Sequence, residues 1–171
     1  MALFYHSGMV ELRAEEPRRA IVALEMYLSG HYLVPKINGW DYYNKPPLFN
    51  WLIASSYWLF QSFSEWAVRV PSMVAFLVTG LLHYIYTKKY IGKRAALYAA
   101  LFFLTAADLF FYATINTGEI DLFYALLVYL QVLSIFAGQQ RGNYLLLFAG
   151  SYFLCALGVL TKGPPSVLFQ G

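Results

Sequence analysis

The sequence has little charge and almost no cysteine. Only 12% of its 171 residues are charged, whereas 60% are hydrophobic, and a soluble domain of this size carries about twice that charge. The single Cys155 excludes a disulfide framework. No metal-ligand spacing and no glycine-rich phosphate loop are present, so the sequence indicates no cofactor; a divalent metal is an open alternative without a supporting motif. The net charge of +3 does not point to nucleic acid.

Long apolar runs take up most of the chain instead. A membrane-spanning helix needs about 20 mostly apolar residues, and four stretches qualify: 68–86, 95–113, 120–137 and 144–160. A fifth run, 47–60, is only about 14 residues long, which favours an interfacial or re-entrant helix. We therefore predict an all-α, polytopic transmembrane bundle in the cell (inner) membrane, in contact with its lipids. Residues 11–66 would form a first extracytoplasmic loop with juxtamembrane helices.

The basic residues predict the orientation. The connector 87–94 carries four of them and 138–143 carries Arg141, whereas 114–119 carries none. Because short basic loops stay in the cytoplasm, the first two connectors should be cytoplasmic. If 47–60 does not cross the membrane, four polar motifs share the extracytoplasmic face, and their convergence predicts a site. These motifs are 15–19, 44–47, 116–121 and 161–164.

The first loop offers a candidate base and a candidate anion contact. Glu15 and Glu16 precede a segment with helical apolar spacing at Ile21, Leu24 and Leu28. Carboxylates there either stabilise the helix start or act as a general base toward an acceptor hydroxyl, with Arg18 as an anion partner. Lys45 stands just before two prolines that permit a new helix. It either attracts an anion to that helix start or extends to the lipid headgroups.

Two further motifs lie at the ends of predicted spans. Glu119 and Asp121 begin the span 120–137, where helix capping explains one carboxylate. Asp121 lies deeper, where an ionised group is costly and tends to be functional. Lys162 ends the last span beside Gly163-Pro164. A basic group next to irregular backbone at membrane depth lines a cavity, or it is a terminal lysine that reaches the interface.

The order and spacing of these motifs carry a family resemblance over about residues 11–164. The matching segments are Glu15–Ala20 with Glu25-Met26, Asn38-Gly39, Tyr43–Leu48 with Trp51, Ala67–Ser72, Gly118–Asp121 and Leu160–Pro164. Together they resemble the aminoarabinose transferase and protein O-mannosyltransferase superfamily of C-type glycosyltransferases.

The resemblance implies a sugar donor on a polyprenyl phosphate, a lipid or protein acceptor, and transfer at the extracytoplasmic face. The family's catalytic acid in the first loop is usually the Asp of an Asp-Glu pair. Glu15 stands there in this chain, so the choice between Glu15 and Glu16 as the base stays open, and the second acid maps to Asp121. The lysine before Pro-Pro implies a donor-phosphate contact for Lys45. We expect further substrate contacts from the remaining charged residues of these motifs: Arg18, Arg69, Glu119 and Lys162.

Members of this superfamily are longer than this chain. We therefore expect residues 1–171 to be the N-terminal portion of one transmembrane domain. Two other functions are compatible with parts of the pattern. A transporter- or flippase-like module that binds lipid phosphates needs the cations but not the carboxylates, and a non-catalytic scaffold needs neither.

Overall fold

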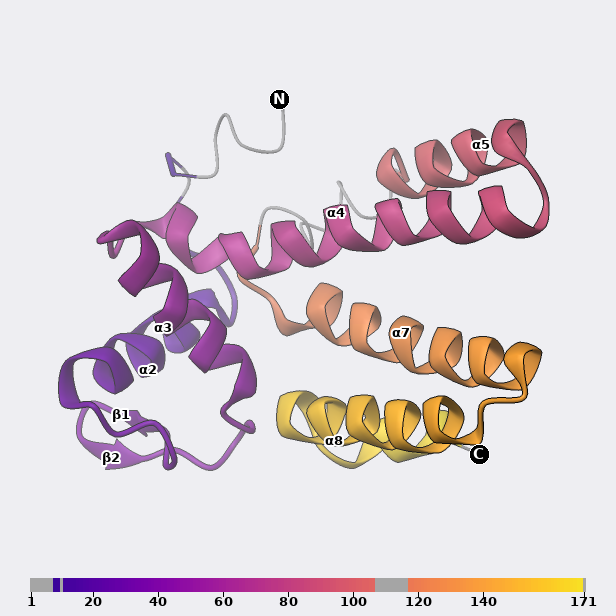
Figure 1. Ribbon diagram of the computed structural model, residues 1–171. Coiled ribbons are helices and arrows are strands. Elements are labelled where there is room, and N and C mark those ends of the chain that lie inside the picture. Colours follow the sequence, from indigo (N-terminus) through magenta and orange to yellow (C-terminus); the bar gives the residue numbers. More distant parts are fainter. Residues whose placement is uncertain (1–7, 10, 107–116, 171) are drawn as a thin grey trace.

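The computed structural model describes residues 8–9, 11–106 and 117–170. Helices dominate this part of the chain, and a two-stranded hairpin joins the first two (Figure 1). The predicted all-α, polytopic membrane fold is confirmed. In chain order the elements are α2 (Glu16–Ser29), β1 (Lys36–Ile37), β2 (Trp40–Asp41), α3 (Leu48–Phe60), α4 (Glu65–Tyr90), α5 (Lys93–Leu104), α7 (Ile120–Arg141), the π-helix η1 (Leu146–Gly150), α8 (Ser151–Lys162) and the 3-10 helix η2 (Pro164–Phe169).

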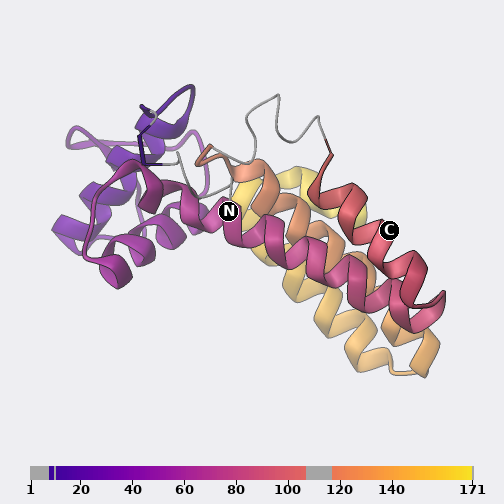
Figure 2. The ribbon, with the colours of Figure 1, turned by 90° about the horizontal axis from the view of Figure 1, so that it is seen from above.

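The longer helices form a bundle whose members alternate in direction. α4 runs parallel to α7, and α5 and α8 return antiparallel to them (Figure 1). α4 packs against both α5 and α7, and α7 packs against α8. Seen from above, α2, α3 and the hairpin lie together beside one end of this bundle (Figure 2). The N-terminal ends of α4 and α7 and the C-terminal end of α8 therefore all face the first loop.

Two helices of the described segments are long and apolar enough to cross a membrane. α4 has 26 residues and α7 has 22, which at 1.5 Å per residue gives lengths of about 39 and 33 Å, against a hydrocarbon core of about 30 Å. The predicted span 95–113 coincides with α5 up to Leu104, and its residues 107–113 lie outside the described residues. The predicted span 144–160 corresponds to the shorter apolar helix Leu146–Lys162.

α3 covers the fifth apolar run and is too short to cross. Its 13 residues reach about 20 Å. It packs instead against α2 and the start of α4, where apolar side chains of all three helices form the core of the first loop. The buried members from α3 and α4 include Phe49, Ile53, Tyr57 and Val68.

The buried face of α2 differs from the predicted apolar stripe. Ile21 and Leu28 are exposed, whereas the buried residues of α2 are Glu16, Arg19, Val22, Ala23 and Met26. These residues recur every three or four positions and so share one face of the helix. The inward face of α2 therefore begins with two charged residues, Glu16 and Arg19. Both can be buried there because Arg69 pairs with Glu16 and Glu119 pairs with Arg19.

The turn at Asn38 and Gly39 determines the geometry of the hairpin between α2 and α3. Asn38 and Gly39 have φ of 52° and 81°, and positive φ at both central residues is typical of a tight two-residue turn that joins antiparallel strands. The turn is also held from α2, because the Glu25 carboxylate accepts the backbone N–H groups of Asn38 and Gly39.

Candidate active site

A buried ion pair lies at the junction of the first loop and the bundle. Glu16 and Arg69 have side-chain exposures of 0% and 1%. Arg69 donates from Nε to Glu16 Oε1 at 2.8 Å and from Nη2 to Oε2 at 3.0 Å. The Arg13 N–H also donates to Glu16 Oε2 at 2.8 Å, and the Gly118 N–H donates to Oε1. Such two-point contacts, supplemented by backbone donors, offset the cost of burying both charges.

The segment before α7 approaches α4 so closely that only glycine fits at position 118. A Cβ there would lie 2.7 Å from Val68 Cγ1 and 3.1 Å from the Val68 carbonyl oxygen. Ser72 reinforces this contact, since its hydroxyl donates to the Glu119 carbonyl at 2.7 Å. The Gly-Glu-x-Asp motif is thus fixed against the N-terminal part of α4.

Glu119 links the start of α7 to the first loop. Its Oε1 accepts the Glu15 N–H at 3.4 Å, and its Oε2 lies 3.9 Å from Arg19 Nε. Burial raises the pKa of the Glu119 carboxyl, and the charge of Arg19 partly opposes this rise. The Arg19 guanidinium also lies 5.6 Å from the centre of the Phe49 ring, so α2, α3 and α7 meet at this arginine.

The carboxylate next to Glu16 in the sequence faces solvent. Glu15 has 42% of its side chain exposed and binds Arg18, with Oε2 2.8 Å from Nη1. A hydrogen bond to Tyr42 and the charge of Glu15 raise the pKa of Arg18. An exposed pair of this kind contributes little to stability, so the Glu15 carboxylate is available for other contacts.

Asp121 and Lys162 form the second ion pair at this end of the bundle. The Lys162 ammonium donates to Asp121 Oδ1, and half of the Asp121 side chain is exposed. Lys162 Nζ also lies 5.3 Å from the centre of the Tyr124 ring. The predicted residues of α7 and α8 therefore meet each other, at a position open to a ligand.

Lys45 lies in the loop that leads into α3. α3 begins at Leu48 with Pro47 as its N-cap, which confirms that a helix starts directly after the two prolines. None of the four ion pairs in the described ranges involves Lys45. α3 contacts α8, so this loop leads into a helix that packs against the element carrying Lys162.

Most of these residues were proposed from the sequence, and their roles stay predictions. Glu16 was a candidate general base and Arg69 a candidate substrate contact; both are buried, and they pair with each other. The structure therefore favours a structural role for both. Arg19, Ser72 and Thr117 were not singled out, although the position of Arg19 three residues after Glu16 was a usable signal. Thr117 Oγ1 and Asn50 Oδ1 are buried without a hydrogen-bond partner among the described residues, which is uncommon for buried polar atoms.

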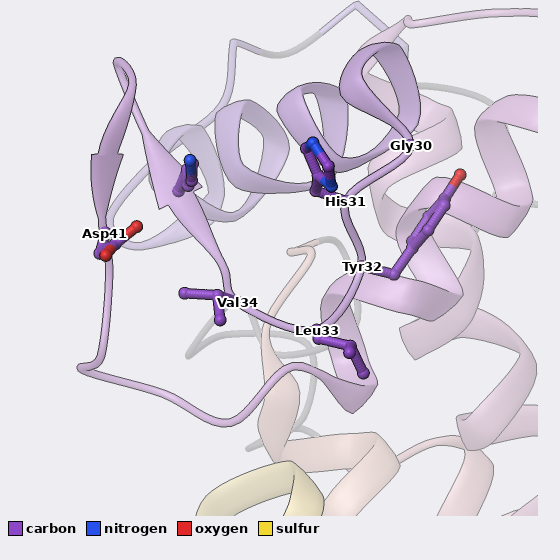
Figure 3. Close-up of a pocket in the computed structure, with 7 residues that line it drawn as sticks. Gly30, His31, Tyr32, Leu33, Val34 and Asp41 are labelled. Atoms are coloured by element: carbon purple, nitrogen blue, oxygen red, sulfur yellow. The ribbon is translucent and has the colours of Figure 1, made fainter.

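The first loop also contains a separate concavity of about 410 Å³. It lies between the end of α2 and the hairpin, where His31, Val34 and Asp41 border it (Figure 3). It shares no lining residue with the four polar motifs. Within the ranges that the structure describes, no group of three or more His, Cys, Asp or Glu side chains could hold a metal ion.

Comparison with known proteins identifies the family. Residues 44–169 match the family described as dolichyl-phosphate-mannose-protein mannosyltransferase. The chain belongs to this family. The match begins at Asn44 and ends at Phe169, so it includes Lys45, the Gly118–Asp121 motif and Lys162.

Similar curated proteins carry a related description. The chain is 29% identical over 165 residues to the undecaprenyl phosphate-alpha-4-amino-4-deoxy-L-arabinose arabinosyl transferase of Edwardsiella ictaluri, covering 91% of this chain and 28% of that protein. It is 30% identical over 152 residues to a Proteus mirabilis protein of the same description, covering 87% of this chain and 27% of the relative. The chain thus spans little more than a quarter of these relatives.

Solved structures share the fold. ArnT from Cupriavidus metallidurans in the apo state superposes with a TM-score of 0.82 at 23% identity, over 97% of this chain and 32% of that one. The structure of ArnT bound to undecaprenyl phosphate gives a TM-score of 0.83 at 24% identity, over 97% and 31%. At this identity the likeness establishes the arrangement of the helices.

Proposed function

We propose that the full-length protein transfers a sugar from a polyprenyl-phosphate donor to a lipid or protein acceptor at the extracytoplasmic face of the inner membrane. Family membership supports the reaction class. The descriptions of the curated relatives name an undecaprenyl-phosphate-linked aminoarabinose, and one structural neighbour is bound to undecaprenyl phosphate. The gathering of carboxylates and cations at one end of the bundle supplies the chemistry that such a transfer needs.

Glu15 is the proposed general base. The observation that carries this choice is the contrast between the two neighbouring carboxylates: Glu16 is enclosed by four donors, whereas Glu15 is half-exposed. A base must reach the acceptor hydroxyl to take its proton, and Glu16 could do so only after breaking its contact with Arg69. Arg18, at 2.8 Å from Glu15, orients the carboxylate.

Lys45 and Lys162 are the proposed contacts of the donor phosphate. The leaving group of the transfer is an anionic lipid phosphate, so cations fixed near it stabilise the charge that develops as the sugar departs. Lys45 is free of ion pairs among the described residues and can accept a phosphate without losing another contact. Lys162 is held by Asp121, which we propose positions this lysine. Glu119 and Arg19 connect the base segment to the same end of α7.

Turnover by the full-length protein tests the assignment. Glu15→Gln and Glu16→Gln variants are purified at matched levels and assayed with a radiolabelled polyprenyl-phosphate sugar, and donor binding is measured in parallel. Loss of a positioned base costs about 10²–10⁴-fold in rate. Glu15→Gln should therefore lose turnover while its donor binding and thermal unfolding stay near those of the parent protein.

Other outcomes point to different conclusions. An active Glu15→Gln protein beside a stable but inactive Glu16→Gln protein would move the base by one residue. Full activity of both variants would make Asp121 the leading carboxylate. A parent protein that binds the donor but never cleaves its sugar–phosphate bond, with every acceptor class tested, would favour a lipid-phosphate-binding transporter or flippase-like module.

A further inference from the structure

Another polar region lies at the opposite end of the bundle from the ion pairs. α4 and α7 both end there, and the connector to α5 begins there (Figure 1). No acidic residue occurs between positions 66 and 106 or between 122 and 170, so nothing in those segments neutralises the cations of this end. The cations are Lys88, Lys89, Lys93, Arg94 and Arg141.

A groove runs into this basic end. Two cavities of about 420 and 160 Å³ adjoin each other, because both are lined by Tyr86, Ala137 and Arg141. The larger cavity continues between α7 and the π-helix toward Phe153 of α8. The smaller cavity opens toward Lys89. We call the two cavities together the basic groove. It has cations at its mouth and a mainly apolar wall along its length.

The wall of the groove is fixed by close packing of α7 against the π-helix. A Cβ added at Gly138 would lie 2.6 Å from Leu147 Cβ, and one added at Gly150 would overlap Ser134 Oγ. The Ser134 hydroxyl donates to the Leu146 carbonyl at 2.9 Å. Single π-helical turns occur frequently at functional sites. Here the turn lies where the groove passes from α7 to α8.

We propose that the basic groove binds an anionic phospholipid of the cytoplasmic leaflet. Arg141 and Lys89 face the groove and take part in none of the ion pairs that the described residues form, so both can hold a phosphate. Basic pockets between membrane helices on the cytoplasmic side bind anionic lipid headgroups in this manner. The apolar wall beyond them suits an acyl chain, which distinguishes a lipid from a soluble phosphate.

Aromatic side chains around the mouth agree with a position at the membrane interface. Tyr90 packs against Phe136 with ring centres 5.1 Å apart, and Tyr86 stacks on Tyr90 at 6.4 Å. Lys89 Nζ lies 5.0 Å from the Tyr90 ring centre. Tyrosines concentrate at the depth of the headgroups, so the cations of the groove lie where a lipid phosphate would be.

Binding of a fluorescent phosphatidylglycerol to the full-length protein tests the proposal. The protein is placed in nanodiscs of phosphatidylcholine, and energy transfer between the probe and a dye on a cysteine introduced at Gln140, beside Arg141, reports the bound probe. One cation near an anionic lipid contributes a factor of roughly five. The Lys89→Gln/Arg141→Gln double variant should therefore bind the probe about 25-fold more weakly. Arg141→Lys should retain most of the binding, and unlabelled phosphatidylglycerol should compete whereas glycerol 3-phosphate should not.

The matched control is Lys93→Gln/Arg94→Gln, which removes the same charge at the same end of the bundle but leaves the groove lining intact. It should bind the probe nearly as the parent protein does. Equal weakening by both double variants would refute a defined groove and leave only diffuse surface charge. Competition by glycerol 3-phosphate would replace the lipid with a soluble phosphate ligand. Binding no stronger than that of a labelled phosphatidylcholine would refute the proposal outright, as would a double variant whose thermal unfolding matches the parent and whose binding is unchanged.

Discussion

Replacing Glu16 by leucine should open the junction between the first loop and the bundle. Leucine removes a carboxylate that accepts two hydrogen bonds from Arg69 and one each from the Arg13 and Gly118 N–H groups. The Arg69 guanidinium would stay in a site with 1% exposure without this counter-charge. Breaking a buried pair by removing one partner costs about 3–5 kcal/mol. At tenfold per 1.4 kcal/mol, the locally open state should rise about 100- to 4,000-fold.

Hydrogen exchange measured by mass spectrometry resolves this effect, because the Gly118 amide is itself a donor to Glu16. The peptide that contains Gly118 should exchange faster in Glu16→Leu, whereas peptides from the middle of α7 should not. Glu15→Leu is the matched control, since its carboxylate is half-exposed and its loss should leave exchange at Gly118 near that of the parent.

The double variant Glu16→Leu/Arg69→Met distinguishes the effect of an unpaired buried charge from the effect of altered packing. Apolar residues of similar volume often replace a buried pair at little cost, so the double variant should exchange more slowly than Glu16→Leu alone. Equal exchange in Glu16→Leu, Glu15→Leu and the parent protein would refute the buried pair. It would also remove the reason for preferring Glu15 as the base.

Three further outcomes follow from the same geometry. Gly118→Ala should lower stability by about 1–3 kcal/mol through overpacking against Val68, as measured by thermal unfolding with Gly8→Ala as the control. Burial raises the pKa of Glu119 above its ordinary 4.5, so the folded chain holds that proton more tightly than the unfolded chain. The free energy of unfolding should therefore fall as the pH rises from 4.5 toward the raised pKa, and Glu119→Gln should lose this part of the pH dependence in unfolding measured across that range. A cysteine at Asn44 should react with a membrane-impermeant reagent from outside and one at Ile91 should not; reaction of both from the same side would contradict the orientation.

The helices could be predicted from the sequence because apolar length is a strong constraint in a membrane. A spanning segment must satisfy its own backbone hydrogen bonds, so 68–86 and 120–137 were predicted as spans, and both coincide with helices long and apolar enough to cross. α4 and α7 extend beyond those limits, to 65–90 and 120–141, since a helix continues into its polar flanks as long as nothing breaks it. The π-helix could not be predicted, because it depends on how Ser134 and Gly150 meet across two helices.

The charged residues of the candidate site could be proposed from the sequence, but not the partner of each. Adjacent residues on a helix point about 100° apart, so Glu15 and Glu16 had to differ, and only the direction of the buried face decides which one is enclosed. Ile21 and Leu28 were assigned to the buried face, but both are exposed, so that assignment could not identify the enclosed carboxylate. The partner of Glu16 was equally out of reach, since Arg69 lies 53 residues further along the chain and several other cations were equally plausible by composition.

The enclosure of Glu16 also sets an order for the assembly of the protein. The Glu16 carboxylate accepts one of its hydrogen bonds from the Gly118 N–H, which lies 102 residues further along the chain. A chain synthesised at about 5–20 residues per second needs about 5–20 seconds to cover that interval. During this time α2, α3 and α4 have already emerged. Until the start of α7 arrives, the Glu16 carboxylate can pair with Arg69 and the Arg13 N–H but lacks the Gly118 N–H. The hydrogen bonds around Glu16 can therefore be complete only once the start of α7, which also carries Asp121, has been synthesised.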